Sequence, residues 1–265
     1  MKRYRSISAN PEGLRGVELA TDDELREIEP LIRGNLHVEF DKNYIYLNLN
    51  PNPSEGERLL EGHPEFQSIH DEYGFISPTV LVIEDYVKFY MLRYKKGHSE
   101  RDVREGLKVE KAFDIILQNA GLYVNYPEPI RDWREGQGAP YPQPCDFYIP
   151  LFGKLEIKSV TDFRGSNRVN VPSGEWCDEN ADYLVALSHI GGCYVMLCGA
   201  MPSDKVNSYV NGNYHIKHSK SPEFTGPFLS IPLDDFPIKG RTLYETLLTT
   251  RKQIDELPQV KIEAT

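Results

Sequence analysis

The residues best suited to chemistry are two carboxylates and a lysine in neighbouring runs, CDFYIP (145–150) and KLEIKSV (154–160). Both runs alternate apolar with polar side chains, as strands do, and a short Leu-Phe-Gly turn joins them. Because side chains alternate along a strand, Glu156 and Lys158 share one face while their apolar neighbours share the other. If the hairpin is centred on the leucine of the turn, Asp146 lies directly opposite Glu156, with Cβ atoms about 5 Å apart.

This spacing predicts metal-assisted hydrolysis of a phosphodiester bond. Two carboxylates this close repel each other unless a cation lies between them. Hard oxygen ligands with few protein donors suit Mg²⁺, for which we expect Mn²⁺ to substitute. The ion lowers the pKa of a bound water and stabilises charge on a phosphoryl oxygen, and Lys158 can hold that water or neutralise the transition state. The alternative is a surface hairpin with an acid–lysine pair worth about 0.2–1 kcal/mol and no catalysis.

The surrounding residues resemble a known family. Pro144 precedes Asp146 with one residue between them, Glu156-Ile157-Lys158 follows after the short turn, and Glu110 lies in the preceding predicted helix. This combination resembles the PD-(D/E)xK nuclease superfamily, which includes many restriction endonucleases, Holliday-junction resolvases and repair nucleases. The resemblance covers about residues 99–200, and the extra residue after Pro144 departs from the motif. It implies an α/β core with a mixed central sheet and DNA cleavage with one or two metal ions.

The resemblance also implies a role for each residue. Asp146, Glu156, Glu110 and the backbone carbonyl of Ile157 would be the metal ligands, and Lys158 would act beside them in catalysis. For Glu110, the alternative is an exposed helix charge that pairs with a neighbouring base.

Two groups of basic residues are candidates for contact with DNA. Arg164 and Arg168 lie in a polar segment just past Lys158, and guanidinium groups suit bidentate contact with phosphate. A plain polar loop is the alternative for this segment. Upstream, eight basic side chains lie between Lys88 and Lys111. They form either a solvated helix face or, in part, a nucleic-acid contact.

We expect an α/β protein in which residues 99–265 form a restriction-endonuclease-like catalytic domain, with a central mixed sheet flanked by helices. Residues 1–98 would be an N-terminal α+β extension for DNA recognition or dimerisation. Residues 51–77, rich in Pro, Gly and charge, are expected to be irregular, and the stretch between the strands at 154–160 and 181–190 irregular or helical. Caps and apolar periodicity predict helices at 21–32, 78–96, 99–120 and 241–256, and strands at 36–40, 44–50, 121–126, 145–150, 154–160, 181–190 and 193–200.

The net charge of −10 is concentrated near the N-terminus, since residues 17–72 hold four basic and fourteen acidic side chains. The remainder is near neutral, which permits a local basic groove but argues against tight non-specific DNA binding through bulk charge. The sequence has no apolar run of membrane-spanning length and no secretory signal pattern. We therefore expect a cytoplasmic protein without a membrane segment.

Together these features predict a metal-dependent DNA endonuclease of restriction-like type. Cutting both strands of a duplex calls for two active sites, so we expect a homodimer. One alternative is a non-catalytic nucleic-acid- or protein-binding module that retains a nuclease fold. Another is a structure-specific nuclease of the junction or repair type.

Overall fold

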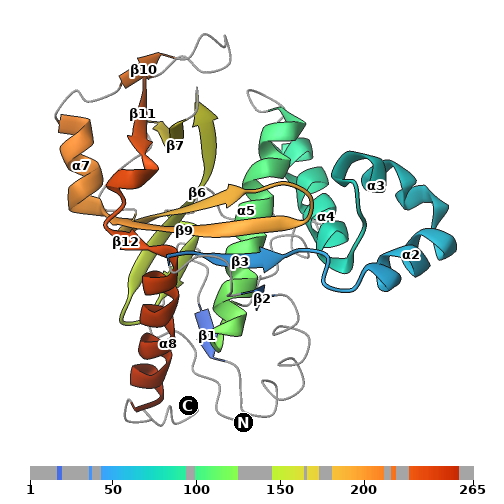
Figure 1. Ribbon diagram of the computed structural model, residues 1–265, viewed down its shortest axis with the longest axis horizontal. Coiled ribbons are helices and arrows are strands. Elements are labelled where there is room, and N and C mark those ends of the chain that lie inside the picture. Colours follow the sequence, from blue (N-terminus) through green and yellow to red (C-terminus); the bar gives the residue numbers. More distant parts are fainter. Residues whose placement is uncertain are drawn as a thin grey trace, which may run out of the picture.

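The computed structural model describes residues 17–19, 36–37, 43–93, 99–124, 145–163, 166–172, 181–211, 216–218 and 227–256 (Figure 1). The predicted helix at 21–32, Pro144 and Arg164 lie outside these residues. The helices are α2 (Pro53–Gly62), η1 (Pro64–Phe66), α3 (Gln67–Tyr73), α4 (Pro78–Arg93), α5 (Glu100–Asn119), α7 (Ser203–Asn211), η2 (Leu233–Asp235) and α8 (Gly240–Glu256). The strands are β1 (Val17–Leu19), β2 (Leu36–His37), β3 (Ile45–Asn48), β4 (Leu122–Val124), β5 (Phe147–Ile149), β6 (Gly153–Phe163), β7 (Ser166–Pro172), β8 (Tyr183–His189), β9 (Tyr194–Pro202), β10 (Ile216–His218), β11 (Pro227–Pro232) and β12 (Ile238–Lys239).

A mixed sheet forms the centre of the fold. Its strand order is β10-β11-β7-β6-β8-β9-β3-β2, with β5 paired to β6 and β12 paired to β9. β6 and β8 run parallel, whereas β9 is antiparallel to both β8 and β3. The expected α/β architecture, with a mixed sheet flanked by helices, is therefore confirmed (Figure 1). β3, which comes from the predicted N-terminal extension, is a member of this sheet.

The hairpin of β5 and β6 has the expected register. Phe147 pairs with Leu155, so the turn is centred on Leu151. Gly153, at the end of this turn, has a φ of 126°, and a Cβ there would lie 2.5 Å from Oδ2 of Asp182. Both the conformation and the close approach require glycine at this position.

Helix α5 crosses one face of the sheet. The Oγ of Ser99 accepts a hydrogen bond from the backbone N–H of Asp102 at 3.1 Å, which caps the helix. Phe113 on the buried stripe meets Phe147 of β5 edge to face, with 5.5 Å between the ring centroids. Residues of α8 belong to the same apolar core, whereas α7 joins a second core on the other face. Among the described residues, none of the helices is both long enough and apolar enough to cross a membrane.

The expectation that residues 51–77 are irregular is wrong, because α2, η1 and α3 occupy most of this segment. Pro53 stands in the first turn of α2, where a helix does not use the backbone N–H that proline lacks. Gly56 lies inside α2, where a Cβ would come within 2.3 Å of the carbonyl oxygen of Ile76. Residues that suggested turns in the sequence therefore start a helix and permit a close contact.

The expected irregular or helical stretch after Lys158 is also wrong in its first part. β6 continues to Phe163, and the chain then returns as β7, which pairs with β11. Val169 and Val171 of β7 are fully buried in the core that contains α7. Alternate apolar residues thus give this polar segment one buried face, as in other half-buried strands.

Three basic side chains of the run on α4 and α5 form ion pairs within the protein. The best buried is Arg104, whose side chain is 9% exposed and whose Nε lies 2.7 Å from Oε1 of the equally buried Glu84. The hydroxyl of Tyr73 donates to the same oxygen at 2.6 Å. These contacts favour a structural role for this part of the run. Among the described residues, Arg104 pairs with Glu72, Glu84 and Glu100, Lys108 with Glu105, and Lys111 with Asp114.

Candidate active site

The candidate site lies at a gap along one edge of β6. On that edge β5 pairs with β6 as far as Leu155, and β7 pairs with it only from Val160 onward. Neither of these two strands pairs with residues 156–159 in the described ladders. The other edge of β6 is paired to β8 through Leu155–Ser159. The divergence of β5 and β7 therefore exposes a short length of backbone that the rest of the sheet holds rigid.

Asp146 fills part of this gap. Its backbone N–H donates to the carbonyl of Leu155 at 3.0 Å, and its Oδ2 accepts from the backbone N–H of Ile157 at 2.7 Å. Asp146 directly precedes Phe147, whose partner in the ladder is Leu155, so Asp146 lies beside the backbone of Glu156 at the open end of the hairpin. Because the N–H and C=O of one strand residue point to the same side, the carbonyl of Ile157 faces the same gap.

Glu156 and Lys158 stand together on one face of β6. Their side chains are 24% and 27% exposed, and Nζ of Lys158 lies 2.6 Å from Oε1 of Glu156. Leu155 and Ile157, on the opposite face, are buried in the core beneath α5. The alternation predicted from the sequence is therefore present, and it positions both charged groups from a single rigid strand.

The carboxylates influence one another electrostatically. Burial, followed by the charge of Asp146, raises the pKa of Glu156 to about 7. Glu110 of α5 adds to this increase in the pKa, whereas Lys158 opposes it. Glu110 therefore belongs to the electrostatic environment of Glu156.

The chemistry of these side chains fits a hard divalent cation. Carboxylate oxygens are the ligands that Mg²⁺ prefers, and this ion commonly keeps several waters and uses only one or two protein carboxylates. A cation would also offset the repulsion that raises the pKa of Glu156. In the part of the chain that the structure describes, no three His, Cys, Asp or Glu side chains form a preassembled metal-binding group. The assignment of Asp146, Glu156 and Glu110 as metal ligands therefore stays a prediction.

Of the two arginines predicted to bind DNA, the structure describes Arg168. Arg164 lies outside the described residues. Arg168 is in β7, where it pairs with Thr161, and its Nη1 donates to the carbonyl of Ser230 at 3.1 Å. Val160, two residues after Lys158, pairs with Val169, so strand alternation places Arg168 on the face opposite to Lys158. Its role in DNA binding stays a prediction.

The structure adds a polar residue that the sequence did not single out. Oδ2 of Asp182 accepts a hydrogen bond from the backbone N–H of Lys154 at 2.7 Å, and the backbone N–H of Asp182 donates to the carbonyl of Lys154 at 2.8 Å. These bonds place Asp182 next to β6, the strand that carries Glu156 and Lys158. Its only signal in the sequence is a position directly before the apolar run of β8, which many structural aspartates share.

Comparison of the chain with protein-family models, with curated proteins and with solved structures found no match. The geometry of the site and the residues themselves therefore carry the functional interpretation.

Proposed function

We propose that this protein is a metal-dependent endonuclease that hydrolyses phosphodiester bonds of DNA, with a catalytic core of the PD-(D/E)xK, restriction-endonuclease-like type. The observation that carries the proposal is the gap between β5 and β7. There the carboxylate of Asp146 is held on the backbone of Ile157, next to Glu156, and Lys158 lies beside them.

In this proposal Asp146 and Glu156 hold Mg²⁺, or Mn²⁺ in its place, with help from the Ile157 carbonyl and Glu110. When bound, the ion supplies an acidified water and stabilises negative charge on the phosphoryl oxygen. The ammonium of Lys158 cannot be a metal ligand, because it has no lone pair to donate. Lys158 instead exchanges its bond to Glu156 for contacts with the attacking water and the phosphoryl oxygens, where its charge stabilises the transition state.

The partners in this proposal are DNA and a second copy of the chain. A homodimer supplies the two active sites that a double-strand cut requires. Arg164 and Arg168, which follow Lys158 in the sequence, would contact phosphate groups of the DNA. We further propose that the protein acts in the cytoplasm.

A second candidate function is a binding module that performs no catalysis. The 2.6 Å ion pair between Lys158 and Glu156 favours it, because the same contact would serve a purely structural purpose. In that case the nuclease-like hairpin would present charge to a partner without turnover.

Cleavage of nucleic acid by the full-length chain separates these candidates. Supercoiled plasmid, branched DNA and single-stranded DNA are incubated with the protein in Mg²⁺ or in EDTA. We expect cleavage of at least one substrate in Mg²⁺ only, lost in Asp146→Asn and retained in Asp234→Asn, an exposed aspartate elsewhere in the chain. Cleavage of none of these substrates by the wild-type chain would favour the binding module.

A further inference from the structure

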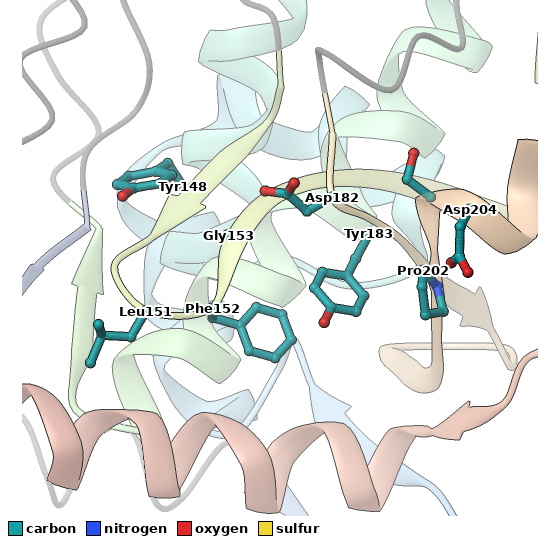
Figure 2. Close-up of a pocket in the computed structure, with 9 residues that line it drawn as sticks. Tyr148, Leu151, Phe152, Gly153, Asp182, Tyr183, Pro202 and Asp204 are labelled. Carbon is teal, nitrogen blue, oxygen red and sulfur yellow. The ribbon is translucent and has the colours of Figure 1, made fainter.

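An open cavity of about 560 Å³ lies at the end of the sheet where β5 turns into β6 (Figure 2). One wall is aromatic, because the rings of Phe152 and Tyr183 stack with 4.8 Å between their centroids. In Figure 2 these rings lie side by side between the hairpin turn and Pro202. The polar groups of the cavity come from Tyr148, Asp182, Ser203 and Asp204.

The cavity lies directly beside the candidate active site, along the same two strands. Tyr148 pairs with Lys154 in the hairpin, one step along the same strand faces from Asp146 and Glu156. Two residues of a strand span about 6.6 Å, so Tyr148 lies one such step from Asp146. Asp182, which also lines the cavity, accepts a hydrogen bond from the backbone N–H of Lys154, two residues before Glu156.

The lining groups define the kind of ligand that fits. None of the described residues that line the cavity is basic, so their side chains offer no cation to pair with a phosphate group. Asp182 and Asp204 present carboxylates, which accept hydrogen bonds and require a donor. The Oγ of Ser203 is buried and has no hydrogen-bond partner, a state that a polar ligand would relieve. A flat ring that carries hydrogen-bond donors matches the aromatic wall and these groups together.

We propose that the cavity binds an unpaired nucleobase with an exocyclic amino group, next to the phosphodiester bond that is cut. Because the ligand is taken to belong to the same substrate, the proposal rests on the proposed function. Tyr148 supplies a face for stacking, a contact that every base can make. The carboxylates then select the base, since the cytosine amino group donates to Asp whereas thymine presents an acceptor at the same edge. The substrate class is nucleic acid whose base beside the cut is unpaired or extruded from the duplex.

Binding of free nucleosides to the full-length protein tests this proposal without any cleavage. Cytidine and thymidine, both as 2′-deoxyribonucleosides, are titrated in the absence of metal and followed by ligand-observed NMR. We expect cytidine to bind at least about tenfold more tightly than thymidine. Tyr148→Ala and Ser203→Ala should weaken cytidine binding, while Asp234→Asn should not. Melting temperatures of the variants show whether each is folded. If Tyr148→Ala does not fold, Ser203→Ala, which removes only one oxygen, carries the test.

Three results would overturn the cavity proposal: equal affinity for cytidine and thymidine, cytidine binding that survives both cavity variants, or no binding of either nucleoside. Spermidine is added as a competitor, and binding of spermidine alone would make the cavity a cation site and overturn the proposal as well. The cleavage assay reports separately on the proposed function. A chain that cuts DNA but does not bind cytidine contradicts only the cavity proposal, whereas one that binds cytidine but cuts nothing contradicts only the nuclease.

Discussion

The stability of the protein should fall as the pH rises from about 4.5 to about 7, because of Glu156. Burial and the nearby charge of Asp146 raise the pKa of this carboxyl from 4.5 to about 7 in the folded chain. Between these values the folded protein keeps a proton that the unfolded chain has released, so the free energy of unfolding decreases with pH. A tenfold difference in proton affinity corresponds to about 1.4 kcal/mol. The contribution of Glu156 is therefore at most about 3 kcal/mol, complete near neutral pH.

Glu156→Gln isolates this contribution, since the amide cannot ionise. Urea denaturation of the wild type and of the variant from pH 4.5 to 8 gives the difference in their free energies of unfolding at each pH. We expect this difference to shift against the wild type by up to about 3 kcal/mol and then to level off. In Asp146→Asn the shift should be smaller, because the charge that helps to raise the pKa of Glu156 is gone. The exposed Glu57→Gln is the matched control. A difference that does not vary with pH would refute the electrostatic account of the site.

Other substitutions test separate parts of the structure. Arg104→Ala should lower the free energy of unfolding by about 3–5 kcal/mol, because it leaves the buried Glu84 without its cation; a loss under about 1 kcal/mol in urea denaturation would contradict this. Lys158→Ala should preserve DNA binding in Ca²⁺ but slow single-turnover cleavage by about 10²–10³, and an unchanged rate would make the lysine purely structural. Gly153→Ala should destabilise by more than about 1 kcal/mol, whereas Gly106→Ala, with nothing near its Cβ position, should stabilise by about 0.5–1 kcal/mol. Similar melting temperatures for the two glycine variants would be the opposing result.

The hairpin of β5 and β6 could be predicted because apolar and polar side chains alternate along both strands, which allows little choice of register. A shift by one residue would turn Leu155 and Ile157 out of the core and bury Glu156 and Lys158 in their place. The buried strands β8 and β9 were predictable for a similar reason, since their nearly continuous apolar runs require cover on both faces. In these segments the local pattern and the tertiary structure agree.

Other parts depend on contacts between distant segments, which a local pattern does not contain. Pro53 and Gly56 suggested a loop, but Pro53 stands in the first turn of α2 and Gly56 lets the helix pass close to the backbone of Ile76. β7 has only a few apolar residues, so its own sequence predicts a strand weakly. The strand forms because it pairs with β11, a partner distant in the sequence. The cavity is likewise assembled by tertiary packing. Asp182 meets the hairpin where β8 pairs with β6, and the backbone N–H of Ser203, at the end of β9, donates to the carbonyl of Asp182.

The central claim is that Asp146 and Glu156 share a divalent cation in the gap between β5 and β7. Mn²⁺ binding to the full-length protein, followed by electron paramagnetic resonance of the free ion at pH 8, tests this claim most directly. We predict that the wild type and Asp234→Asn bind at least one Mn²⁺ per chain, that Mg²⁺ displaces it, and that Asp146→Asn and Glu156→Gln lose this binding. Mn²⁺ binding of equal strength in Asp146→Asn, or none in the wild type, would contradict the claim.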